Sequence, residues 1–299
     1  MKTRIIVNPN AGSVESLDAL RERLGPLQDT EICRTDHKGH AEELARQAVE
    51  DGIGLVVAAG GDGTLNEVLN GLSADFGRAR LGLLPLGTGN DFARTIGVPD
   101  DLEAAVAVLR DGQTRRIDVG RALIGGNSRW FLNMSVGGFS GVVSEKADEA
   151  KERWGPLAYM RGAVEAWPEL TAFETSIVLN GAERLNVATY NIVISNGRYV
   201  AAGIPVAPQA EVDDGLFEVM IAPATTIPKL AILVPKVLLG QHLNDDLLIF
   251  RRATRIEIES DPPMAFNVDG ELLGEASAVF EVQPRALEMV VGPATGSGS

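Results

Sequence analysis

Short apolar runs alternate with longer helical patterns over the first 120 residues. Residues 4–7, 54–59 and 81–85 are mostly apolar, as expected of strands buried in a sheet. Helical patterns predict helices at residues 15–24, 40–50, 64–72, 90–96 and 102–110. This alternation predicts a parallel sheet with helices on both faces.

The pattern changes near Gly120 to short segments rich in β-branched and aromatic residues. They predict a mainly antiparallel sheet with strands at residues 130–134, 175–179, 188–195, 216–221, 255–259 and 279–282. Residues 155–170 differ, because an apolar stripe predicts an amphipathic helix there: Leu157, Met160, Val164 and Trp167. Such a stripe usually packs in a core, and if exposed it could receive an acyl chain.

The chain of 299 residues is therefore expected to form two domains. Residues 1–119 form an α/β domain, to which residues 285–299 can return, and residues 120–284 form a β-rich domain. A content of 45% hydrophobic and 23% charged residues is that of a folded protein.

Charge and cysteine content exclude several classes of protein. The net charge of −14 argues against general nucleic-acid binding, which depends on clustered Lys and Arg. Cys33 is the only cysteine, so a disulfide within the chain and a Cys-rich zinc site are excluded, and a reducing, cytoplasmic location is expected. His37, His40 and His242 lack metal-ligand spacing and are expected at the surface.

Membrane contact is expected to be peripheral. The N-terminal apolar run before Asn8 is too short for a signal peptide. Residues 227–239 are the most apolar later stretch, but Lys229, Pro235 and Lys236 interrupt them, and they fall short of the roughly 20 apolar residues that span a bilayer. We expect residues 154–167 and neighbouring cations to meet the lipid surface.

A glycine-rich turn, Gly60-Gly61-Asp62-Gly63-Thr64, separates an apolar strand from a helix. Its backbone N–H groups and the positive helix end suit a phosphate, and glycine lets that phosphate approach closely. Asp62 would repel a phosphate unless a cation lay between them. The turn indicates a nucleotide site with a divalent metal, and a plain packing turn is the alternative.

Two more loops follow strands in the same manner. They are Leu86-Gly87-Thr88-Gly89-Asn90-Asp91 and Asn8-Pro9-Asn10-Ala11-Gly12. Since the carboxyl ends of parallel strands share one sheet edge, the loops should converge where open α/β sheets bind ligands. The loops match neither the dinucleotide fingerprint nor the P-loop. No lysine occurs between Lys38 and Lys146, so phosphate charge must be met by backbone dipoles, arginines such as Arg94, and a metal.

These loops, with Asn66-Glu67 and Phe92-Ala93, resemble motifs of the diacylglycerol kinase catalytic-domain family, which includes bacterial soluble lipid kinases and sphingosine and ceramide kinases. Later segments, from Pro208 to Leu216 and from Asn267 to Glu271, resemble further family motifs in the expected order. The Gly60 turn is shared with NAD kinases, whereas the Gly87 loop favours the lipid kinases. The resemblance implies an NAD-kinase-like α/β domain, a β-rich lipid-substrate domain and a cleft between them.

The resemblance also implies site residues. Glu271 matches the general base on the acceptor hydroxyl, and Asp62 and Asp91 match the carboxylates of the catalytic magnesium and phosphate site. The implied ATP-binding residues are Asn8, Pro9, Gly12, Gly60, Gly61, Gly63, Thr64, Gly87, Thr88, Gly89 and Asn90.

A structural Mg²⁺ is implied at a second acidic loop. Its ligands would be the Asp214 side chain and the backbone carbonyls of Glu211 and Leu216. From the residues alone, Asp213-Asp214-Gly215 and Asp269-Gly270 are also ordinary hairpin turns, which would leave Glu271 a solvated residue.

The expected function is ATP- and Mg²⁺-dependent transfer of the γ-phosphoryl group to a lipid hydroxyl, such as that of diacylglycerol, in phospholipid biosynthesis at the membrane surface. Positioning and charge neutralisation dominate phosphoryl transfer, which suits glycine turns and carboxylates. The alternatives are NAD-kinase-like phosphorylation of a soluble acceptor and a nucleotide- or lipid-binding protein without turnover. A homodimer is compatible with the sequence.

Overall fold

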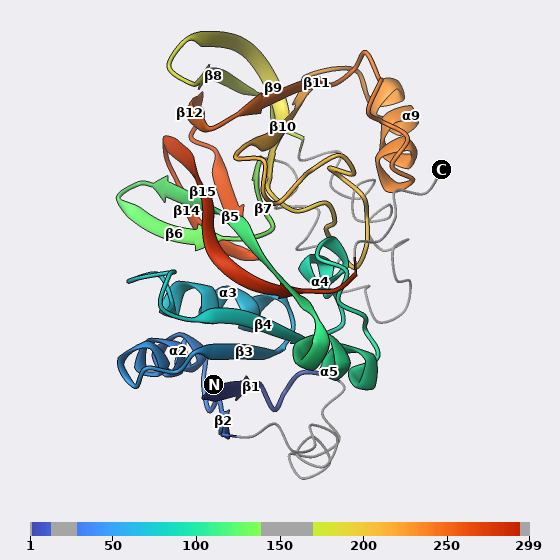
Figure 1. The fold of residues 1–299 in the computed structure, drawn as a ribbon. Coiled ribbons are helices and arrows are strands. Elements are labelled where there is room, and N and C mark those ends of the chain that lie inside the picture. Colours follow the sequence, from blue (N-terminus) through green and yellow to red (C-terminus); the bar gives the residue numbers. More distant parts are fainter. Residues whose placement is uncertain (1, 13–28, 139–169, 294–299) are drawn as a thin grey trace. The chain divides into compact units, whose positions relative to one another are not determined.

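The computed structural model describes residues 2–12, 29–138 and 170–293 (Figure 1). The chain divides into two compact units. One comprises Met1–Val119 with Pro284–Ser299, and the other comprises Gly120–Gln283. Two strands, β5 (Gln113–Ile124) and β15 (Ala278–Val291), carry the chain from one unit to the other.

The first unit contains a parallel sheet in the order β4-β3-β1-β2. Its strands are β1 (Thr3–Val7), β2 (Thr30–Arg34), β3 (Leu55–Gly60) and β4 (Arg80–Pro85). The last part of β15 adds a parallel strand beside β4. The central strands β1 and β3 are buried throughout, which explains their continuous apolar sequences.

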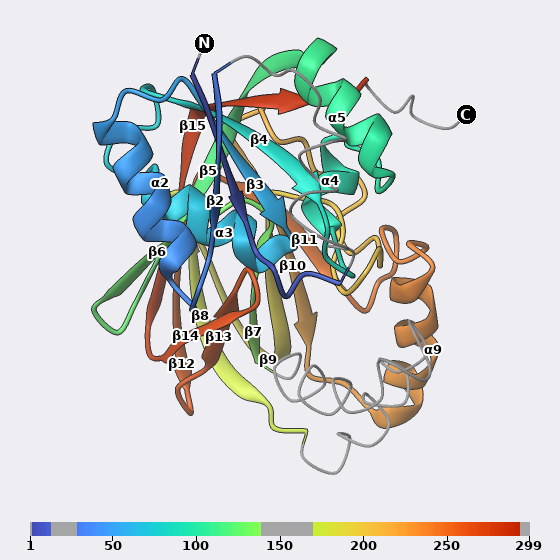
Figure 2. The same cartoon turned by 90° about the horizontal axis from the view of Figure 1, so that it is seen from below.

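Helices cover this sheet (Figure 2). They are α2 (His40–Glu50), α3 (Asp62–Gly71), α4 (Asp91–Thr95) and α5 (Leu102–Asp111). Gly71 allows α2 and α3 to pack closely, because a Cβ there would lie 2.3 Å from the Glu42 carbonyl oxygen. On β4, Gly82 leaves the space that the Leu109 side chain of α5 fills.

The second unit is a mainly antiparallel sheet in the order β14-β13-β7-β9-β8-β12-β15, with β10 pairing β9 and β11, and β6 pairing β5. Its remaining elements are β6 (Asn127–Phe131), β7 (Met134–Gly138), β8 (Phe173–Leu179), β9 (Glu183–Ser195), β10 (Phe217–Pro223), α9 (Ile227–Leu238), β11 (Ile249–Ala253), β12 (Arg255–Asp261), β13 (Ala265–Val268) and β14 (Glu271–Glu275).

Two apolar clusters stabilise the second unit. One contains four fully buried phenylalanines in ring contact, Phe131, Phe217, Phe266 and Phe280. The other includes Leu233 of α9 and Val193 of β9. Because Ile192 and Ile194 belong to the first cluster and Val193 to the second, the two clusters lie on opposite faces of β9.

The fold class predicted from the sequence is confirmed: a parallel sheet with helices precedes an antiparallel β-rich region. The single strand predicted at residues 130–134 is wrong, because β6 ends at Phe131 and β7 begins at Met134. The backbone N–H groups of the two residues between them donate to the Asp269 carboxylate instead of to a neighbouring strand. The helices predicted at residues 15–24 and 155–170 lie outside the described residues.

Candidate functional site

Three loops begin side by side at the carboxyl edge of the parallel sheet. Val7 pairs with Ala59, and Ala59 pairs with Leu84, so β1, β3 and β4 end in register. The Asn8 N–H donates to the Ala59 carbonyl at 3.0 Å, and the Leu86 N–H donates to the Gly60 carbonyl at 2.9 Å. The loops predicted to converge therefore do so.

The glycines of these loops permit close contact between backbones. A Cβ on Gly87 would lie 2.5 Å from the Cα of Gly61, a distance that no side chain tolerates. A Cβ on Gly12 would lie 3.9 Å from the Thr88 Oγ1. Close contact thus requires glycine at Gly87, whereas Gly63 has nothing within 4 Å of its missing side chain.

The start of α3 offers anion-binding groups. Gly63 and Thr64 lie in its first turn, where backbone N–H groups lack partners within the helix and the helix dipole is positive. Thr64 is buried, and its Oγ1 accepts a hydrogen bond from the Asn8 side-chain amide at 3.3 Å. Gly63, Gly12 and Thr88 are exposed, so a phosphate could reach all three loops.

Asp62 connects its own loop, residues 60–64, to the loop of residues 86–91. Its carboxylate accepts hydrogen bonds from the backbone N–H of Asp91 at 3.1 Å and of Phe92 at 3.2 Å. These groups begin α4, so Asp62 stabilises the N-terminus of that helix from another part of the chain. This structural role was not predicted from the sequence.

Asp62 and Asp91 surround Gly89. A Cβ on Gly89 would lie 3.0 Å from the Asp62 Oδ2 and 3.7 Å from the Asp91 Oδ2. Asp91 is 6% exposed. Two carboxylates this close, beside an anion-binding helix end, form an oxygen-rich donor set that fits a hard divalent cation.

Arg94 and Asn90 hold the third loop in place. Arg94 donates to the Gly89 carbonyl, lies 3.6 Å from the Asp91 carboxylate and binds Asp100 at 3.3 Å. Asn90, in a left-handed conformation with φ 51°, accepts from the Gly87 N–H and donates to the Gly87 carbonyl. Both side chains therefore bind the loop itself, which is a role that the sequence did not indicate for either.

Glu67 of α3, which the sequence motif contained without an assigned role, extends its side chain to the N-terminus of α2. Its carboxylate accepts hydrogen bonds from the N–H groups of Gly39 at 2.9 Å and Ala41 at 3.1 Å. Glu67 thus supplies the N-terminal cap that α2 lacks in its own sequence.

In the second unit, Glu271 is the first residue of β14. The preceding Asp269 and Gly270 have φ 45° and 93°, as in a two-residue hairpin turn. The Glu271 side chain is 29% exposed, and its Oε2 lies 3.3 Å from Arg129 of β6. Glu271 is therefore oriented by an ion pair.

Asp269 fixes this turn. Its carboxylate accepts hydrogen bonds from the N–H groups of Leu132 at 2.9 Å, Asn133 at 3.1 Å and Met134 at 2.9 Å. Three successive backbone donors, two between β6 and β7 and one on the first residue of β7, thereby hold the hairpin that presents Glu271.

The acidic loop at Asp214 is stabilised by an arginine. Asp214 is hydrogen-bonded to Arg252 and accepts from the Leu216 N–H at 3.0 Å, and Arg252 also binds Glu218 at 2.8 Å. Burial raises the pKa of the Glu218 carboxyl; Arg252 opposes the rise, and the carboxylates of Asp214 and Glu211 add to it. The excess negative charge and the oxygen donors fit a hard cation, although Arg252 already meets part of that charge.

Among the described residues, no group of three or more His, Cys, Asp or Glu side chains is arranged to hold a metal. His37 and His40 stack on each other near the surface. The expectation of a surface position is wrong for His242, which is fully buried with its Nε2 at 2.9 Å from the Val206 carbonyl.

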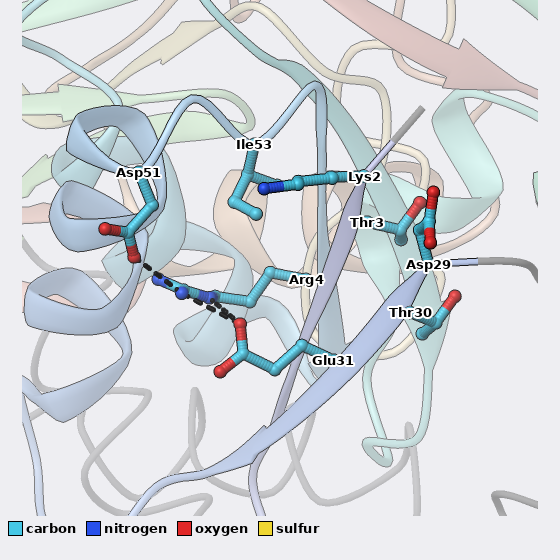
Figure 3. Close-up of a pocket in the computed structure, with 8 residues that line it drawn as sticks. All are labelled: Lys2, Thr3, Arg4, Asp29, Thr30, Glu31, Asp51 and Ile53. Carbon is cyan, nitrogen blue, oxygen red and sulfur yellow. Dashed lines mark hydrogen bonds and ion pairs between the residues drawn. The ribbon is translucent and has the colours of Figure 1, made fainter.

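A pocket of about 490 Å³ lies at the amino ends of β1, β2 and β3, the edge opposite the three loops (Figure 3). Arg4, which lines it, binds Glu31 at 2.8 Å and Asp51 at 2.7 Å. Arg4 is thus paired with two carboxylates, and the lining as a whole carries three carboxylates, of Asp29, Glu31 and Asp51, against the cations Arg4 and Lys2 (Figure 3). This pocket does not suit a phosphate.

No helix in the described part of the chain is long and apolar enough to cross a bilayer. The region predicted to meet the lipid surface, residues 154–167, lies outside the described residues.

Comparison with known proteins agrees with the geometry. The family of the diacylglycerol kinase catalytic domain matches residues 2–122, and the YegS C-terminal NAD kinase beta sandwich-like domain matches residues 134–291. A diacylglycerol kinase of Staphylococcus epidermidis is 33% identical over 93% of this chain and 88% of its own. One of Staphylococcus aureus is 32% identical over 93% and 89%.

Solved structures show the same fold. A candidate diacylglycerol kinase from Bacillus anthracis is 26% identical, with a TM-score of 0.83 over 98% of both chains. A second structure from the same organism, 24% identical with a TM-score of 0.76, shares the fold over 98% of this chain and 97% of its own. The chain therefore belongs to the diacylglycerol kinase catalytic-domain family and is a lipid kinase, an enzyme that transfers phosphate to an alcohol.

Proposed function

We propose that this lipid kinase transfers the γ-phosphoryl group of ATP, with Mg²⁺, to the hydroxyl group of diacylglycerol at the cytoplasmic surface of a membrane. The observation that carries the proposal is the convergence of the three loops at one sheet edge, with Asp62 and Asp91 around Gly89. The names of the relatives support diacylglycerol as the acceptor.

The first unit is assigned the nucleotide. The exposed residues Gly12, Gly63 and Thr88 receive the phosphates, while Asn8 and Asn90 hold the loops in position. Asp62 and Asp91 would hold the Mg²⁺, which neutralises phosphate charge as it develops. Arg94 is bound to its own loop. The helix dipole of α3 therefore provides much of the remaining stabilisation of the phosphate charge.

The second unit is assigned the lipid. Glu271 orients the acceptor hydroxyl and removes its proton late in the transfer, and the ion pair with Arg129 keeps the carboxylate in one position. The Asp214 loop would bind a separate, structural Mg²⁺ through the Asp214 side chain and the carbonyls of Glu211 and Leu216.

The test is incubation with labelled ATP and a panel of diacylglycerol, monoacylglycerol, sphingosine, phosphatidylglycerol and NAD, with Mg²⁺ or chelator, followed by phase extraction. Label in the organic phase, dependent on diacylglycerol and Mg²⁺, is the expected result. Label only in aqueous NADP would reassign the acceptor. Nucleotide binding without transfer to any acceptor would indicate a nucleotide-binding protein that does not turn over.

A further inference from the structure

Helix α9 has two apolar sides. Leu230 and Leu233 are buried, and Leu233 packs against the apolar cluster on β9 and β10. On the other side, Ile232 is 60% and Leu239, the residue that ends the helix, 67% exposed. Figures 1 and 2 both show α9 at the rim of the second unit.

Apolar residues on this side form a stripe, defined as Pro228, Ile232, Pro235 and Leu239, of which Pro235 is half-buried and the others are exposed. Their spacing of four, three and four residues places them along one line of an α-helix. Ile227, 49% exposed, adds a further apolar side chain at the N-terminus. An amphipathic surface helix normally presents polar residues outward, so this stripe is unusual.

Lysines flank the stripe on one side. Lys229 and Lys236 are seven residues apart, two helical turns, and lie next to the stripe on the helix. Lys229 is exposed, and Lys236 binds Asp245 at 2.6 Å. From Val219 to Asn244 the chain contains no Asp or Glu, although it carries 41 acidic residues and a net charge of −14. The helix is thus an apolar patch without acidic residues of its own on an acidic protein, with Lys229 exposed and the charge of Lys236 met by Asp245.

We propose that α9 lies in the surface of an anionic phospholipid bilayer, with the stripe inserted among the acyl chains and Lys229 at the headgroups. This inference rests on the proposed function, because an enzyme whose acceptor is a membrane lipid must reach that surface. Exposed apolar residues beside lysines on one helix are the features of an interfacial helix. A stripe one residue wide is too small for a second copy of the chain, since stable protein interfaces use about 20–30 residues a side.

The test is co-sedimentation of the full chain with vesicles of phosphatidylglycerol and phosphatidylcholine, without nucleotide. Ile232→Gln with Leu239→Gln should lower the partition coefficient at least about tenfold, because two inserted side chains are lost. Lys229→Gln should weaken binding mainly at low salt. Leu272→Gln is the matched control, since Leu272 on β14 is 68% exposed, and it should leave binding unchanged.

Unchanged binding of the double variant, or an equal loss for Leu272→Gln, would overturn the proposal. If the wild type is a dimer and Ile232→Gln is a monomer that still binds vesicles, the stripe is a protein interface and the proposal is wrong. Assays with a dispersed short-chain diacylglycerol separate docking from catalysis: the double variant should keep its turnover there and lose it on vesicles. If neither the wild type nor the variants phosphorylate diacylglycerol, the proposed function fails, but the vesicle-binding measurements still test whether α9 is the docking surface.

Discussion

The carboxylate of Asp62 accepts a hydrogen bond from the backbone N–H of Phe92 at 3.2 Å. A residue of the glycine-rich turn at residues 60–64 therefore stabilises helix α4, which begins where the loop of residues 86–91 ends. Any magnesium role of Asp62 coexists with this bond, because a carboxylate has acceptor positions for both.

Asp62→Asn should abolish transfer and also lower stability. The asparagine oxygen can keep one of the two hydrogen bonds, but the amide NH₂ group would face the other backbone N–H, of Asp91 or Phe92, which costs about 1–3 kcal/mol. Asp101→Ala is the matched control, because Asp101 caps α5 by accepting from the Ala104 N–H, and its loss costs about 0.5–2 kcal/mol. Melting temperature and kcat are measured for both. Near-normal kcat in Asp62→Asn at saturating Mg²⁺ would remove the metal role.

Glycine substitutions separate packing from phosphate binding. Gly87→Ala should destabilise the first unit by about 1–3 kcal/mol, because its Cβ would overlap Gly61. Gly63→Ala meets no neighbour and lies in a helix, so stability should rise by up to about 1 kcal/mol. If Gly63 faces a phosphate, the same variant should raise the KM for ATP. An unchanged KM would place the phosphate elsewhere.

The buried strands of the parallel sheet were predictable because continuous apolar sequence occurs where both faces are covered. Strand β2 was not predicted, because Glu31 and Arg34 interrupt its apolar residues, as suits a strand at the edge of the sheet. Helix α9 also escaped, because Pro235 and two lysines interrupt an apolar run whose one side packs and whose other side is exposed.

The site residues were predictable as loops but not as contacts. Motif spacing indicated that three turns would meet at one edge. It did not indicate that Asp62 would bind the start of α4, that Glu67 would cap α2, or that Arg252 would bind Asp214. These bonds join residues that are far apart in sequence, and their partners are backbone groups or ordinary charges, which carry no local signal.

Cys33 should react slowly with soluble disulfide reagents. Burial raises the pKa of its thiol, and the neighbouring Glu31 charge raises it further, while Arg4 opposes the rise. A raised pKa lowers the fraction of reactive thiolate at pH 7–8. Glu31→Gln should therefore speed the reaction. The measurement is the pH dependence of the reaction rate; a slower rate in the variant would contradict the assigned influence of Glu31.

Magnesium should stabilise the second unit more at high than at low pH. The pKa of Glu218 is raised, so the folded state binds its proton more tightly than the unfolded state. Ionisation of Glu218 therefore costs stability above its folded pKa, and this cost disappears below its unfolded value. A cation at Asp214 would offset the cost. The melting-temperature difference between Mg²⁺ and chelator should be larger at pH 8 than at pH 5.

Asp214→Asn should remove that difference, while Glu218→Gln should reduce its pH dependence. Because the surroundings disfavour the charged form of Glu218, Glu218→Gln in chelator should not lower the melting temperature at pH 8. A wild type with equal melting temperatures in Mg²⁺ and chelator at both pH values would leave the loop stabilised by Arg252 and the Leu216 N–H, without a cation.

Glu271→Gln should lower kcat by about 10²–10⁴, the usual worth of a positioned proton transfer, while nucleotide affinity and melting temperature stay close to normal. Glu275, exposed at the other end of the same strand, provides the control Glu275→Gln, which should retain its kcat. Asp269→Asn adds a graded test, since losing one of its acceptor positions loosens the hairpin without removing the base. It should lower kcat less than Glu271→Gln and also lower stability. Equal, small effects of Glu271→Gln and Glu275→Gln would leave the hairpin a structural turn whose carboxylate serves only the ion pair with Arg129.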